Sequence, residues 1–142
     1  MSAFSRPIRL IGLILAIHVV ALLSGWYEFH RWFDIPMHFA GGVAIGLLVL
    51  AGFEVCIDKL SFARTIRPFW QTVIYGLGVL GLVALVGVAW EWYEFIFDTI
   101  AVQLSANVMP AQMGLGDTMA DLFLDLSGGL VAFLGWRKPL GK

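Results

Sequence analysis

Three apolar segments of the chain each carry a row of polar side chains near one end. Within each row the acidic residues and one histidine are three or four positions apart: Asp34 and His38; Glu91, Glu94 and Asp98; Asp117, Asp121 and Asp125. Residues at this spacing lie on one face of a helix. Each segment is therefore predicted to be a helix with a single polar stripe.

Glycines continue each stripe beyond its polar residues. On the same helical faces lie Gly42 and Gly46, then Gly87, then Gly129. Small residues let membrane helices approach one another closely. We expect the three faces to meet, with close packing at the glycines and an acidic pocket at the polar ends.

Several carboxylates and one imidazole together make an oxygen-rich set of metal ligands. Such sets suit Mg²⁺, Ca²⁺ or Mn²⁺, and the imidazole also admits Zn or Fe. The sequence predicts a divalent metal site with ligands drawn from His38, Glu91, Asp117, Asp121 and Asp125. Asp34 and Glu94 are predicted to transfer protons there. A metal at this place could activate water or polarise a phosphoryl group, so the predicted substrate is a lipid headgroup or an envelope precursor.

Simpler roles account for some of these residues. Asp34 and Asp117 could cap the first turns of their helices, and Asp98 could lie at a solvated helix end. His18 stands alone in another apolar segment, and we expect it to be a hydrogen-bonded packing residue. Two other functions stay open: a cation or proton pathway with the acids as relay sites, and a structural or lipid-binding protein whose acids line a wet vestibule.

Four apolar segments are long enough to cross a membrane. Of the 142 residues, 60% are hydrophobic and only 13% are charged, against about 25% charged residues in a soluble domain. A membrane helix needs about 20 mostly apolar residues. The segments run from about residue 8 to 27, 35 to 57, 72 to 97 and 118 to 136. The sequence predicts an all-α protein with a single transmembrane domain of four helices.

The basic residues predict the orientation of these helices. Eight of the nine Lys and Arg residues flank one set of helix ends, and only Arg31 lies at the other. Lys and Arg are enriched in cytoplasmic loops, so both termini are predicted inside and the acidic ends outside. No small-x-small cleavage motif follows the first segment, so we expect an uncleaved anchor rather than a signal peptide.

Composition also argues against other classes of protein. A net charge of −1 gives no electrostatic basis for binding nucleic acid, and the single cysteine, Cys56, cannot form an internal disulfide. No zinc-finger spacing or phosphate-binding Gly-rich loop occurs. The expected partner is the lipid bilayer, with a homo-oligomer left open. The apolar segment from about Ala101 to Gly116 is expected to lie on the membrane surface as a lid, with bends at Pro110 and Gly114.

Three blocks of residues resemble a known group of membrane proteins. The first runs from Phe33 to Phe39 and contains Asp-x-x-x-His-Phe, the second is Trp90 to Phe95, and the third is Gly116 to Asp121 followed by Asp125. Together they are similar to the uncharacterised YjdF-related family and, more distantly, to VanZ-like proteins. The resemblance implies a multi-pass protein of the bacterial or archaeal inner membrane, and it implies no settled activity.

Overall fold

The computed structural model describes residues 3–57, 67–104 and 110–136. Four long helices are α1 (Ser5–Leu23), α3 (Asp34–Ile57), α4 (Pro68–Gln103) and α5 (Leu115–Gly135). The short helices α2 (Trp26–Phe29) and η1 (Arg31–Phe33) connect α1 to α3. Each long helix is long and apolar enough to span a membrane, and the described ranges contain no strand. The predicted all-α, four-helix membrane protein is confirmed.

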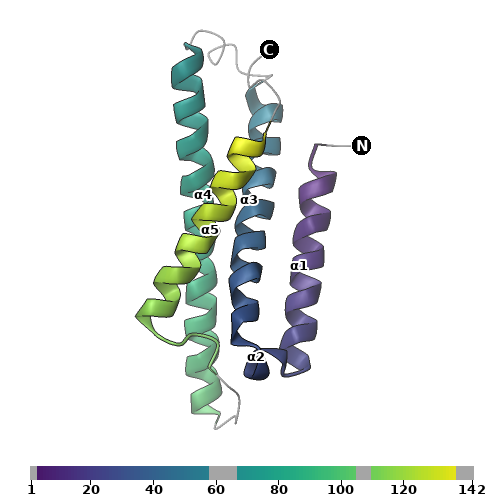
Figure 1. Ribbon diagram of the computed structural model, residues 1–142, viewed down its shortest axis with the longest axis vertical. Helices are drawn as coiled ribbons and strands as arrows, with labels where there is room; N and C mark the ends of the chain where they lie inside the picture. The colour runs from purple at the N-terminus through teal and green to yellow at the C-terminus, as the bar shows by residue number, and fades with distance from the viewer. Residues whose placement is uncertain (1–2, 58–66, 105–109, 137–142) are drawn as a thin grey trace.

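The long helices alternate in direction along the bundle (Figure 1). One end of the bundle, called here the α2 end, holds the end of α1, the starts of α3 and α5, and the C-terminal part of α4. Arg6, Arg9 and Arg67 lie at the opposite end, at the starts of α1 and α4. The other basic residues of the predicted cytoplasmic side lie outside the described residues: Lys59, Arg64, Arg137, Lys138 and Lys142.

Helix α1 ends earlier than expected, at Leu23 rather than near Tyr27. Gly25 follows with φ +66°, a left-handed conformation that glycine adopts without steric cost. The chain therefore turns after α1, and Tyr27 belongs to the separate helix α2. The turn brings Tyr27 back beside α1, where its hydroxyl oxygen lies 2.9 Å from Nδ1 of His18.

Helix α4 is longer than the expected span at both ends. Pro68 occupies its first turn, where a missing backbone N–H costs nothing, and no glycine or proline interrupts the run from Val88 to Gln103. Its 36 residues rise about 54 Å, well beyond the roughly 30 Å of a bilayer's hydrocarbon core. The expected loop from Ala101 is therefore corrected, because residues 101–103 are still helical.

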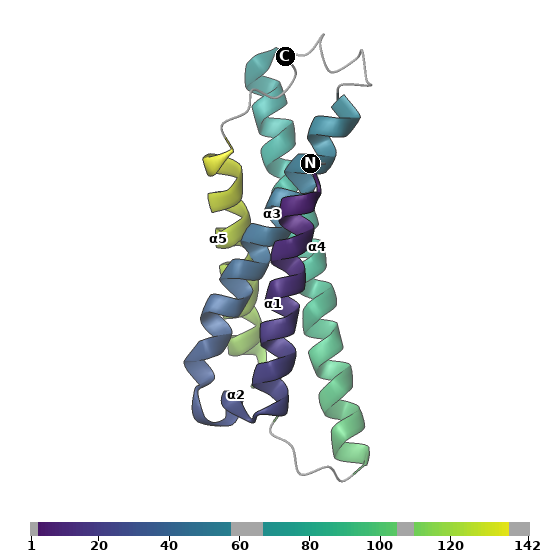
Figure 2. The ribbon, with the colours of Figure 1, turned by 90° about the vertical axis from the view of Figure 1, so that its right-hand side faces the viewer.

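The predicted close packing at the glycines is confirmed, and it is tightest between α3 and α5. A Cβ on Gly42 would collide with the backbone of Asp125, and one on Gly128 would collide with the carbonyl of Phe39. Helix α5 crosses α3 and α4 diagonally, and Figure 2 shows α1 on the far side of α3 from α5. Towards the opposite end, the helices close around a core in which Leu50, Val79 and Val83 are fully buried.

This packing predicts different outcomes for two glycines of the same helix. Gly42→Ala should destabilise the protein by about 1–3 kcal/mol, the usual range for overpacking, because the added methyl meets the Asp125 backbone. Gly52→Ala is the matched control, since no atom lies within 4 Å of its added Cβ. Thermal unfolding in detergent should show a lower midpoint for Gly42→Ala only. Equal midpoints would show that α3 and α5 do not touch at Gly42.

Candidate metal centre

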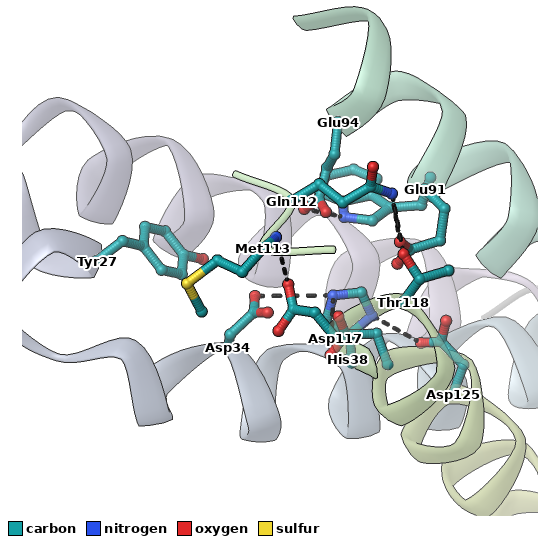
Figure 3. Close-up of polar contacts among 12 residues, drawn as sticks. Tyr27, Asp34, His38, Glu91, Glu94, Gln112, Met113, Asp117, Thr118 and Asp125 are labelled. Carbon is teal, nitrogen blue, oxygen red and sulfur yellow. Dashed lines mark hydrogen bonds and ion pairs between the residues drawn. The ribbon is translucent and has the colours of Figure 1, made fainter. Parts of the chain in front are cut away.

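Helices α3, α4 and α5 bring their polar stripes together near the α2 end of the bundle (Figure 3). Helix α3 contributes Asp34 and His38 from its first two turns, because Asp34 is its first residue. The remaining side chains are Glu91 and Glu94 of α4, and Asp117, Asp121 and Asp125 of α5. All seven predicted site residues therefore belong to one cluster, although their burial and their contacts differ.

His38 is at the centre of the cluster and is only 6% exposed. Its Nδ1 lies 3.4 Å from Oδ1 of Asp125. Its Nε2 lies 3.7 Å from Oδ1 of Asp34 and 3.8 Å from Oδ1 of Asp121. The two ring nitrogens thus face different carboxylates. A carboxylate on one nitrogen commonly fixes a histidine ring while the other nitrogen binds a metal.

Two carboxylate oxygens in the cluster are buried without a hydrogen-bond partner among the described residues. They are Oε1 of Glu91 and Oδ2 of Asp121, in side chains that belong to residues only 4% and 3% exposed. Burying a carboxylate without a partner is costly, whether it is ionised or not. These two oxygens call for a positive charge or a hydrogen-bond donor that the described side chains do not supply.

Two sets of three side chains have the geometry to share a cation. Asp34, His38 and Glu94 form one set; His38, Glu91 and Asp121 form the other, in which every residue is buried. In each set one donor atom per residue lies within 4.8 Å of the others. Two ionised carboxylates at that separation repel by about 3.5 kcal/mol at an effective dielectric constant of 20. A divalent ion between them would reverse the sign of this interaction.

Two other carboxylates of the cluster, those of Glu94 and Asp117, have hydrogen-bond donors. Trp90 donates from Nε1 to Oε1 of Glu94 at 3.0 Å. The backbone N–H of Met113 donates to Oδ2 of Asp117 at 2.9 Å. Asp117 lies in the first turn of α5, and this bond ties the loop to the helix start. Its geometry therefore resembles the simpler, capping role rather than that of a central ligand.

The loop before α5 covers the cluster and contributes a residue that the sequence analysis missed. Gln112 donates from Nε2 to Oε2 of Glu91 at 3.2 Å and to Oγ1 of Thr118 at 2.9 Å. Asp98 accepts the backbone N–H groups of Ala111 at 2.8 Å and Gln112 at 2.9 Å. Asp98 thus anchors this loop instead of ending in solvent. The available signal was a glutamine two positions after Pro110.

A second polar contact lies beside the cluster, between α1 and α2. Burial, together with the charges of Asp34 and Glu94, raises the pKa of Tyr27 well above its ordinary value. The phenol therefore keeps its proton at neutral pH and can donate it to Nδ1 of His18. The His18 ring also meets Trp90 edge-on at 5.1 Å between centroids. The expected packing role of His18 fits these contacts.

Three polar residues at the same end stay outside the cluster: Glu28, His30 and Arg31. Glu28 is exposed. His30 stacks on Trp26 with 4.2 Å between ring centroids. Arg31 is exposed and donates to the sulfur of Met113 at 3.0 Å. Among the described residues, the ion pairs of the clustered carboxylates are all with His38.

Comparison with known proteins places the chain in a family. Residues 5–138 match the family model described as predicted membrane protein (DUF2238), which is nearly the whole chain. The chain belongs to the DUF2238 family. No curated protein and no solved structure matches it. The family description agrees with the four apolar helices and adds no activity to them.

The loop anchor gives a prediction about backbone dynamics. Asp98→Ala removes the acceptor of two backbone N–H groups, so the amides of Ala111 and Gln112 should exchange with solvent faster, by about tenfold if each bond contributes roughly 1.4 kcal/mol. Hydrogen–deuterium exchange read by mass spectrometry measures this rate. Thr99→Ala is the control, because its hydroxyl donates only to the carbonyl of Phe95 on its own helix. Equal exchange in the two variants would contradict the anchoring role.

Proposed function

We propose that this protein binds a divalent metal ion through His38, Glu91 and Asp121 and acts on a lipid headgroup or an envelope precursor. The observation that carries the proposal is the pair of buried carboxylate oxygens, one on Glu91 and one on Asp121, that have no partner among the described residues. Their residues form one set with His38, in which one donor atom of each residue lies within 4.8 Å of the others. Mg, Mn, Ca, Zn and Fe are the candidate ions for this mixed ligand set.

The other residues of the cluster are assigned supporting roles. Asp125 holds Nδ1 of His38 and so leaves Nε2 free to face the ion. Gln112 orients Glu91 through its second oxygen. The metal would supply Lewis-acid chemistry, by lowering the pKa of water or polarising a phosphoryl oxygen. Asp34 also lies at Nε2 of His38, and Glu94 completes the second set with these two residues, so either carboxylate can accept or return a proton.

The proposed location follows from the charges at the two ends of the bundle. Arg6, Arg9 and Arg67 lie at the end opposite the carboxylates. Basic flanks stay in the cytoplasm, so the candidate metal centre would face outwards. We place the protein in the cytoplasmic membrane of a bacterium or archaeon.

A cation or proton pathway is the less favoured alternative for a single copy of the chain. Between the cluster and the opposite end, Gly46 and Gly129 bring α3 and α5 into contact. Beyond them Leu50 and Val79 are fully buried in an apolar core. A charge crossing this region would lose its hydration without gaining polar partners. A purely structural role leaves unexplained the two buried oxygens that have no hydrogen-bond partner among the described residues.

The metal site predicts ion-dependent stability. Purified protein should hold about one divalent ion per chain, and a chelator should lower its thermal midpoint, since an ion at 100 times its Kd stabilises the folded state by about 2.7 kcal/mol. Glu91→Gln and Asp121→Asn should lose both the ion and the chelator effect. Glu28→Gln is the control, because that carboxylate is exposed. Metal analysis and thermal scans with the five ions measure these effects. The proposal is wrong if wild-type protein holds no ion and none of the five stabilises it.

The positioning role of Asp125 predicts a smaller loss than removal of a ligand. Asp125→Asn should weaken metal affinity by about 10–100-fold, the usual cost of losing a carboxylate behind a ligating histidine. Asp121→Asn should weaken it much further. Competition with a fluorescent chelator gives both affinities. Equal losses would instead make Asp125 a direct ligand, as the sequence first predicted.

A further inference from the structure

An apolar cavity opens directly onto the candidate metal centre from the side of α1. Its volume is about 240 Å³, and it lies among α1, α3 and α4. Aliphatic side chains from all three helices form its walls, including Ile11, Ile14, Ile45, Val83 and Val86. Ligand pockets for drug-sized molecules are usually 300–1,000 Å³. A cavity below that range suits one hydrocarbon chain better than two.

The polar end of the cavity is made by residues of the cluster. Asp34, His38 and Asp125 line both the cavity and the centre. Gly41 and Gly87 also line the cavity, and the absence of a side chain at Gly87 leaves room for the Asp125 carboxylate. A molecule in the cavity would therefore place its head among carboxylates and its tail among aliphatic side chains. An amphiphile has this shape and polarity.

The length of the cavity matches the thickness of the hydrocarbon layer in one leaflet of a bilayer. Asp34 and Ile45 are eleven positions apart on α3, about 16 Å along a helix. Half of a hydrocarbon core about 30 Å thick is nearly the same distance. Helix α1 packs mainly against α3, and the ring of His18 on Trp90 joins it to α4 near the polar end. A lipid chain would enter between α1 and α4, because these two lining helices have few contacts with each other.

The charge of the centre decides which head the cavity can accept. The cluster contains six carboxylates, on Asp34, Glu91, Glu94, Asp117, Asp121 and Asp125. Their ion pairs among the described residues are with His38 alone. One divalent ion balances only two negative charges. An anionic head would add to the excess, whereas an ammonium group would reduce it.

We propose that this cavity binds one hydrocarbon chain of an amine-bearing membrane lipid, with the ammonium group held between Asp34 and Asp125. The inference rests on the proposed function, because it names the class of headgroup brought to the metal centre. Ile14 and Val86 contact the chain from α1 and α4. His18 closes the polar end beside the headgroup.

The test compares two photoactivatable lipids in nanodiscs of phosphatidylcholine. Phosphatidylethanolamine and phosphatidylglycerol, each with a diazirine in one chain, are added at equal amounts and irradiated, and labelled peptides are mapped by mass spectrometry. The ethanolamine lipid should label the peptides around Ile14 and Val86 at least fivefold more than the glycerol lipid. Asp34→Asn should reduce that preference, because it removes one of the two carboxylates at the polar end.

Matched variants separate the cavity from the general lipid surface. Ile14→Trp and Val86→Trp fill the cavity and should reduce labelling by the ethanolamine lipid at least fivefold. Leu13→Trp and Leu85→Trp are one position away on each helix, are exposed and do not line the cavity, and they should label like the wild type. Equal labelling by the two lipids, or a preference for the glycerol lipid, would overturn the assignment of an ammonium headgroup. Equal loss in all four tryptophan variants would overturn the cavity as the binding site.

Metal content of the same wild-type preparation keeps the two proposals apart. Protein that holds its ion but shows no ethanolamine preference would contradict only the lipid inference. Protein without an ion that keeps this preference would contradict only the metal site. We expect both results: the wild-type protein holds its ion, and it prefers the ethanolamine lipid until the cavity is filled.

Discussion

The contact between α3 and α5 at glycine is the constraint on which the rest of the arrangement depends. Gly42 and Gly128 allow each helix to rest on the backbone of the other, and any side chain there would force them apart. Because the helices are this close, His38 of α3 lies within 4 Å of Asp121 and Asp125 of α5. The same approach, continued at Gly46, closes the apolar core beneath the cluster.

The buried carboxylates need hydrogen-bond donors or positive charges around them. Indole, glutamine and backbone donors satisfy part of their hydrogen-bonding capacity. These donors come from α4 and from the loop before α5, so the loop is as much a component of the cluster as the helices are. One oxygen of Glu91 and one of Asp121 have no hydrogen-bond donor in the part of the chain that the structure describes. Glu91 and Asp121 also form a set with His38 that could share a cation, which is why the metal proposal centres on these three residues.

Much of the fold and of the cluster could be predicted from the sequence, because helical spacing fixes faces and glycine marks where faces touch. Helical spacing alone groups His38 with Glu91, Asp121 and Asp125. It missed Gln112 and the anchoring role of Asp98, because loop conformation is not periodic and depends on distant acceptors. It also missed the bond from Tyr27 to His18, which exists only because Gly25 turns the chain back. The proposed roles of Asp121 as a ligand and Asp125 as a positioning residue depend on which nitrogen of His38 each one faces. Helical spacing does not predict this.

The length of α4 has a consequence for how the protein responds to its membrane. Transmembrane helices tilt by up to about 40°, and even at that tilt a helix of 36 residues projects about 40 Å along the membrane normal. About 10 Å of it must therefore emerge into the headgroup layers. If the C-terminal part emerges, Asp98 and the loop it anchors stand among headgroups. A thicker bilayer would draw this end inwards and a thinner one would expose it, so bilayer thickness itself would set how tightly the loop covers the carboxylates.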